Sequence, residues 1–294
     1  MFYIFLSACC SVGVSVLLKL FRRYHIDIFQ AITWNYAVAT ILTLLFLKPQ
    51  FQAIHSAPTY IYTSLGILLP ALFVILGLSV KHTGIVRTDI AQRLSLLIPL
   101  IIAFVLFKEP LTADKATGIV VGLAAVLCLI PWKQKQHNYR HQYAWVFLLI
   151  VFAGMGLIDV LFKQMALFKG ASYATSLLIV YALAFVLCLL RLLYLVFIKH
   201  VRFAVHYIAG GVILGIINFG NILFYLKAHQ ALASQPSIVF SSMNIGVIAL
   251  GTLVGMVVFK EKLTLLNRIG IALALVAIAI IYFSLVSKYI LPAA

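Results

Sequence analysis

Charged residues inside apolar runs are the first candidates for functional residues in this chain. A charge at membrane depth costs free energy, so a charged residue there is expected to have a function. One run opens with Asp89, followed by Gln92 and Arg93. Asp89 and Arg93 are four residues apart and are therefore neighbours on one face of a helix. Arg93 could bind a carboxylate or a phosphate through its planar guanidinium while Asp89 holds it in place. The alternative is an ion pair between the two side chains that needs no substrate.

An acid and a base have the same spacing in a later run, where Asp159 precedes Lys163 by four residues. Lys163 has a counterpart in Lys19, near the end of the first run, but Ser15 stands where the acid would be. Lys19 therefore needs another partner, which could be water at the membrane edge, Asp159 or the substrate. Asp159 could also exchange a proton for substrate, because an apolar environment disfavours a charged carboxylate.

Uncharged polar and aromatic residues extend this set of candidates. The polar ones occur at helical spacing in two later runs, where they could line a cavity or form hydrogen bonds between helices. Two tyrosines could stack on a substrate or bind a cation. The complete set of candidate substrate-binding residues is Lys19, Asp89, Gln92, Arg93, Asp159, Lys163, Asn218, Asn221, Ser237, Ser241, Asn244, Tyr36 and Tyr181.

The composition indicates that membrane spans position these residues. Hydrophobic residues make up 65% of the 294 residues and charged residues only 10%, against roughly 25% charged in soluble domains. The net charge of +16 does not predict a nucleic-acid partner, because the basic residues stand singly between apolar runs as anchors at lipid headgroups. The four cysteines lack metal-ligand spacing, so we expect no metal and no cofactor. No catalytic motif is present, so we expect no enzyme.

Ten apolar runs approach the roughly 20 residues that cross a bilayer. We therefore predict an all-α polytopic membrane protein with ten transmembrane helices. Remaining connections are short, apart from a polar stretch at 133–142. The predicted spans are 2–20, 28–47, 59–80, 89–107, 116–132, 143–164, 173–198, 205–228, 235–259 and 264–287.

An internal repeat divides the ten spans into two halves. The sequence Phe-Lys-Glu-Pro-Leu-Thr begins at Phe107, and Phe-Lys-Glu-Lys-Leu-Thr begins 152 residues later at Phe259. Because five is an odd number of crossings, the second half must be inverted, as in carriers that build a site near the bilayer midplane. We predict a first five-helix repeat at 1–132, a polar linker at 133–142 and a second, inverted repeat at 143–294.

Other positions repeat as well. Lys19 matches Lys163 at an offset of 144, and Tyr36 matches Tyr181 at an offset of 145. We expect Glu109 and Glu261 of the repeated turn to cap or pin neighbouring helices at opposite membrane surfaces, rather than to contact substrate.

With a Phe-Lys-Glu turn after the fourth span of each half and a glycine following it, Gly118 and Gly270, the chain resembles the drug/metabolite transporter superfamily in its ten-span EamA-type branch. The resemblance covers nearly the whole length. It implies secondary transport of small organic solutes, often export of amino acids or other metabolites. It also implies a central cavity lined mainly by spans one, three, four, six, eight and nine, and it implies no particular substrate.

We therefore expect a carrier that moves a small polar metabolite by alternating access, with Pro70 and Pro99 as hinges. Basic candidates favour solutes that carry a carboxylate or a phosphate, such as amino acids. One alternative is export of amphipathic or cationic compounds through Asp89, Asp159 and the aromatic residues. Another is a channel or a scramblase on the same scaffold. The expected partners are a small-molecule substrate, the lipid bilayer, and protons or another coupling ion, and we expect a monomer rather than a dimer.

Orientation gives two conflicting expectations. Connections on one side carry twelve basic residues and those on the other side carry six, so the positive-inside rule would place both termini outside the cell. The resemblance implies cytoplasmic termini in a bacterial cytoplasmic (inner) membrane. We lean to the second expectation, because several of the twelve lie at span ends.

Overall fold

The computed structural model describes residues 1–24, 26–49, 58–83, 85–129, 144–168, 170, 172–200, 204–260 and 264–290. Every regular element in these ranges is an α-helix. In chain order the helices are α1 (Phe2–Arg23), α2 (Ile28–Leu47), α3 (Thr59–Thr83), α4 (Ile85–Leu94), α5 (Leu97–Val105), α6 (Ala113–Leu129), α7 (Ala144–Leu167), α8 (Tyr173–Phe197), α9 (Val205–Ala231), α10 (Pro236–Phe259) and α11 (Leu265–Ile290).

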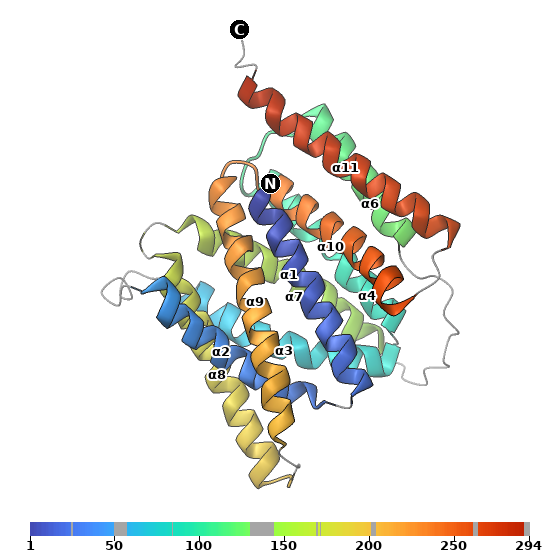
Figure 1. Ribbon diagram of the computed structural model, residues 1–294. Helices are drawn as coiled ribbons and strands as arrows, with labels where there is room; N and C mark the ends of the chain where they lie inside the picture. Colours follow the sequence, from blue (N-terminus) through green and yellow to red (C-terminus); the bar gives the residue numbers. More distant parts are fainter. Residues whose placement is uncertain are drawn as a thin grey trace.

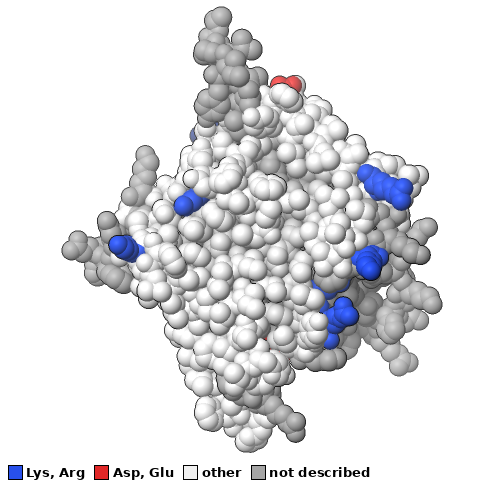
Figure 2. Space-filling view, in the orientation of Figure 1, with Lys and Arg blue, Asp and Glu red and all other residues white. Residues whose placement is uncertain are grey.

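These helices agree with the predicted polytopic membrane fold. Within the described ranges, eight helices are long and apolar enough to cross a membrane, and a shorter apolar segment covers Ile90–Val105. That segment corresponds to the predicted fourth span, and α6 lies where the fifth was predicted. The outer surface suits lipid, because large apolar side chains such as Leu45, Leu190 and Leu265 are exposed. Figure 2 shows a face on which basic side chains form separate spots with broad uncharged areas between them.

Span four differs from its prediction because it consists of two helices. The helix α4 ends at Leu94, and α5 begins at Leu97. The cause is Pro99, which has no N–H for the carbonyl group four residues earlier, that of Ser95. The chain closes tighter turns there: the Leu96 N–H bonds the Arg93 carbonyl at 3.3 Å, and the Ile98 N–H bonds the Ser95 carbonyl at 3.0 Å. Tighter turns therefore interrupt the regular α-helical hydrogen bonding inside an apolar span.

The helices of the first and second halves of the chain interleave. Helix α1 packs on α9 and α10, while α7 packs on α3, α4 and α5. Helix α2 packs on α8, and α6 packs along α11 at one edge of the bundle (Figure 1). The main core lies between these layers and buries Tyr36, Tyr181 and Phe240 completely. The central helices therefore come from both halves.

Four non-glycine residues have a left-handed backbone in the part of the chain that the structure describes. They are Lys48 (φ 44°), Lys108 (φ 50°), His200 (φ 51°) and Lys260 (φ 54°). Such residues commonly end helices. The four form two pairs, because Lys48 and His200, like Lys108 and Lys260, are separated by 152 residues.

Candidate functional site

The interruption of span four lies directly against α7. A Cβ atom added to Gly156 would lie 2.7 Å from the Ile98 Cβ and 3.0 Å from the Ser95 carbonyl oxygen. Only glycine allows this approach without movement of the break. Gln92 and Arg93 lie in the last turn of α4 with partly exposed side chains. The predicted pairing of Asp89 with Arg93 cannot be followed, because the Asp89 side chain lies outside the described part of the chain.

Asp159 lies one helical turn after Gly156 and is held from α9. The Tyr225 hydroxyl donates a hydrogen bond to Asp159 Oδ1 at 3.0 Å. The Tyr225 ring meets Phe162 edge-on, with ring centroids 6.2 Å apart. Asp159 remains partly exposed. Its carboxylate is therefore oriented by a tyrosine within an aromatic setting.

Helix α9 carries four polar residues at spacings of three, four and four, namely Asn218, Asn221, Tyr225 and His229. This spacing places them along one helical face, here called the polar face of α9. The Ser7 hydroxyl on α1 donates to Asn221 Oδ1 at 2.9 Å, whereas Tyr225 reaches α7. The polar face of α9 therefore looks toward helices of both halves.

Sequence reasoning named the two asparagines of this face and missed the other two residues. His229 is completely buried. Its ring lies 4.7 Å from the Tyr225 ring and 4.8 Å from the Phe240 ring, centroid to centroid. Neither ring nitrogen has a hydrogen-bond partner among the described residues, although buried polar groups are usually paired. Extending the helical spacing from Asn221 would have found both residues.

Lys163 is also completely buried, one turn after Asp159. Its ammonium donates to the Ala233 carbonyl at 2.8 Å and to the His229 carbonyl at 3.4 Å. Both carbonyls belong to the C-terminal end of α9 and the turn after it. A positive charge is favourable there, because a helix C-terminus carries partial negative charge. Lys163 therefore stabilises the end of α9, and its predicted contact with substrate remains a prediction.

Glu109 lies in the connection between α5 and α6 and contacts the N-terminal end of α10. Its carboxylate is buried and accepts hydrogen bonds from the Ser237 N–H at 2.8 Å and the Ser237 hydroxyl at 2.6 Å. Ser237 lies in the first turn of α10, where negative charge is favourable. Lys115 completes the group with a 2.8 Å ion pair to Glu109. The predicted capping role is confirmed for Glu109, whereas Glu261 lies outside the described residues.

The remaining predicted residues fall into two groups. Ser241 is buried and bonds the Ser237 carbonyl at 2.6 Å, while the Asn244 amide bonds the Phe240 carbonyl at 3.0 Å and stays partly exposed. Tyr36 and Tyr181 are fully buried in the core, and Lys19 is exposed near the end of α1. Gln92 and Arg93 thus lie on α4, before the break, and Asp159 and Lys163 lie on α7, the helix that packs on α4 and α5.

A cavity of about 440 Å³ lies between the start of α3 and the end of α7. It is lined by the start of α3, by Phe107 of the repeated turn and by the end of α7, where Gln164 contributes a polar group. Gln164 directly follows Lys163 along the chain. The cavity offers room for a solute near the end of α7.

Comparisons with known proteins agree with this architecture. The sequence profile of the EamA-like transporter family matches residues 1–131. A protein of Haemophilus influenzae, described as uncharacterized, is 43% identical over 282 residues, which cover 93% of this chain and 95% of that protein. A solved crystal structure matches with a TM-score of 0.72 over 98% of this chain and 97% of its own, at 14% identity. At that identity the match supports the fold alone.

Proposed function

The chain belongs to the EamA-like transporter family and is a multi-pass membrane transporter of the drug/metabolite superfamily, and from this premise we propose a substrate class and a mechanism. The protein is a secondary carrier that moves a small polar metabolite by alternating access. Its substrates carry a carboxylate or a phosphate, and amino acids are the first candidates. It acts in a bacterial cytoplasmic membrane with both termini in the cytoplasm, and the Haemophilus relative supports a bacterial setting.

The observation that carries the proposal is the contact between the broken span and α7. Breaks inside spans free backbone groups at membrane depth, and transporters use such breaks to hold substrates. Here Arg93 lies two residues before Ser95, and Asp159 lies one turn after Gly156, which touches Ser95. An amino acid has a carboxylate for the guanidinium and an ammonium for Asp159. A basic group on α4 and an acidic group on α7, which packs on the break, thus match a zwitterion.

Alternating access rests on inversion of the two halves, and several observations support it. Residues 1–132 would form one repeat and residues 143–294 the other, while the linker at 133–142 lies outside the described residues. Lys108 and Lys260, the matching lysines of the repeated turn, share a left-handed backbone. Packing is exchanged as a two-fold axis requires, because α1 contacts α9 and α10 just as α7 contacts α3 and the α4–α5 pair.

The test is counterflow in liposomes. Purified protein is reconstituted with unlabelled amino acids inside, and uptake of each labelled amino acid is measured. A carrier accelerates uptake of its own substrate in a saturable manner, whereas a channel or scramblase does not. We expect Arg93→Gln and Asp159→Asn each to reduce counterflow at least about tenfold, as loss of a charge-assisted contact predicts. Arg268→Gln and Asp114→Asn, which change exposed charges at helix ends, are the matched controls.

A result in which both site variants keep wild-type counterflow would remove the proposed substrate contacts. Absence of counterflow for every anionic and zwitterionic solute would remove the substrate class.

A second candidate function is export of cationic or amphipathic compounds. It is favoured by the aromatic surroundings of Asp159, where Tyr225 and Phe162 meet edge-on, since aromatic faces and a carboxylate together suit a cation. In that case Asp159→Asn cells lose resistance to cationic toxicants while Arg93→Gln cells keep it. The amino acid carrier predicts no effect of either variant on this resistance.

A further inference from the structure

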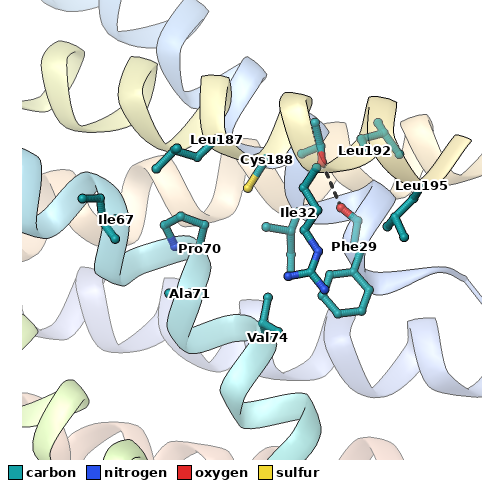
Figure 3. Close-up of a pocket in the computed structure, with 12 residues that line it drawn as sticks. Phe29, Ile32, Ile67, Pro70, Ala71, Val74, Leu187, Cys188, Leu192 and Leu195 are labelled. Carbon is teal, nitrogen blue, oxygen red and sulfur yellow. Dashed lines mark hydrogen bonds between the residues drawn. The ribbon is translucent and has the colours of Figure 1, made fainter. Parts of the chain in front are cut away.

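A second cavity lies between α2, α3 and α8. It has a volume of about 210 Å³. Figure 3 shows Leu187 and Cys188 of α8 on one side, Pro70 and Val74 of α3 on the other, and Ile32 of α2 between them. Its lining is almost entirely apolar, and we call this space the α2–α3–α8 cleft.

The cleft exists because α3 and α8 pack closely at one level and not at the next. At Gly66 an added Cβ would lie 2.6 Å from Leu183 Cδ2, so the two helices touch. One turn later Pro70 interrupts the hydrogen bonding of α3. The adjacent side chain is the small Ala71, which leaves the space beside Leu187 unfilled.

Arg191 is the charged residue of the cleft. Its guanidinium lies 4.6 Å from the centre of the Phe29 ring, and its side chain is exposed. Among the residues that the structure describes, no carboxylate forms an ion pair with it. Stacking uses the face of the guanidinium and leaves N–H donors at its edge for an anion. The Thr33 hydroxyl, which also lines the cleft, already donates to the Phe29 carbonyl at 3.0 Å.

The position of Arg191 suits the headgroup level of a bilayer. It lies six residues before the end of α8, which is roughly 9 Å along a helix, and Phe29 is the second residue of α2. The neighbouring residues Leu190, Leu193 and Tyr194 are exposed apolar or aromatic groups. The cleft therefore opens on the lipid-facing surface, with a cation at its end nearest the headgroups.

We propose that the α2–α3–α8 cleft binds one anionic phospholipid, with an acyl chain along the apolar lining and the phosphate on Arg191. An apolar wall selects for a hydrocarbon chain, and an exposed guanidinium without a carboxylate partner selects for a phosphate. A polar metabolite is a poor match, because the other side chains of the lining are apolar apart from the Cys188 thiol and the Thr33 hydroxyl, which is already bonded. The lipid contacts α2 and α3 of the first half and α8 of the second half together.

The site is tested by native mass spectrometry of the full-length protein released from nanodiscs that contain equal amounts of dioleoyl phosphatidylglycerol and dioleoyl phosphatidylcholine. We expect one phosphatidylglycerol to be retained in preference to phosphatidylcholine. Arg191→Gln should lower this retention about fivefold, the factor expected for one basic residue at an anionic surface. Arg268→Gln, an exposed arginine near the start of α11, is the control and should leave retention unchanged.

A second variant tests the cleft itself. Ala71→Trp fills the space and should abolish retention while the protein still elutes as the wild type does in gel filtration. Equal retention of both lipids, or unchanged retention in Arg191→Gln, would overturn the proposal. Displacement of the lipid by millimolar glycerol 3-phosphate would also overturn it, because the site would then recognise a free phosphate. If the wild-type protein is a dimer and Ala71→Trp makes it a monomer that retains no lipid, the cleft would instead bind a second copy of the chain.

Discussion

Tyr36 and Tyr181 lie against each other in the core, with ring centroids 6.5 Å apart and planes tilted by 41°. The two residues match in the internal repeat at an offset of 145. When equivalent positions of two copies meet in space, the two-fold axis that relates the copies passes between them. The interface of α2 with α8 is therefore where such an axis would run, which supports the proposed inversion.

Inversion predicts that the two repeated turns face opposite compartments. In a protein whose four cysteines are replaced by serine, Lys108→Cys and Lys260→Cys should react with a membrane-impermeant maleimide from opposite sides. Labelling is measured by gel shift in right-side-out and in inverted vesicles, so that the compartment that each cysteine faces can be identified. Labelling of both cysteines in the same vesicle orientation would contradict the inverted repeat and with it the proposed mechanism.

Glu109 should contribute measurably to stability through the first turn of α10. Glu109→Gln keeps the side-chain volume but removes the charge that Ser237 and Lys115 bind. We expect a loss of about 2 kcal/mol, because charge-assisted bonds to a buried carboxylate are replaced by weaker ones. The measurement is thermal melting in detergent, where the midpoint should fall by several degrees. Asp114→Asn in the exposed first turn of α6 should melt as the wild type does.

Replacement of Lys163 should lower the stability of the fold more than it lowers the affinity for substrate. Lys163→Met retains the buried stem but leaves the Ala233 and His229 carbonyls without their donor. The expected cost is about 1 to 3 kcal/mol, the penalty of unsatisfied buried acceptors. Melting should therefore shift while the KM of counterflow changes less than about twofold. A large rise in KM with unchanged melting would instead indicate that Lys163 contacts the substrate.

Asp159 should couple transport to protons if the carrier uses them. Asp159→Asn has nearly the same shape and can still accept from the Tyr225 hydroxyl, but it cannot gain or lose a proton. We expect an imposed pH gradient to accelerate wild-type uptake and to leave residual Asp159→Asn counterflow unaffected. The measurement is initial uptake with and without the gradient. Acceleration that persists in the variant would exclude Asp159 as the coupling group.

The sequence predicts the spans well, because spans depend on hydropathy. The inverted repeat is inferred from short motifs that occur twice, and it stays a prediction. The sequence does not predict the break at Ser95 and Leu96, since a proline inside a span can bend a helix as well as divide it. The function of Lys163 could not be foreseen either. Its partners are backbone carbonyls 66 and 70 residues away. Every residue has a backbone carbonyl, so the residue types do not show which carbonyls a lysine will contact.

The contact at Gly156 predicts a separable effect on transport. Gly156→Ala introduces a methyl group 2.7 Å from the Ile98 Cβ and 3.0 Å from the Ser95 carbonyl oxygen. These atoms belong to the break itself and not to a flexible side-chain end, so α5 must move away from α7. Gly77→Ala is the matched control, because nothing lies within 4 Å of its added Cβ. We expect Gly156→Ala to lower the rate of counterflow at least about tenfold, while Gly77→Ala stays near the wild-type rate. The added methyl group removes no charge, so it tests the packing of the break alone. Equal rates for the two variants would show that the α4–α5 break takes no part in the transport cycle. Asp159 would then act in transport without the break.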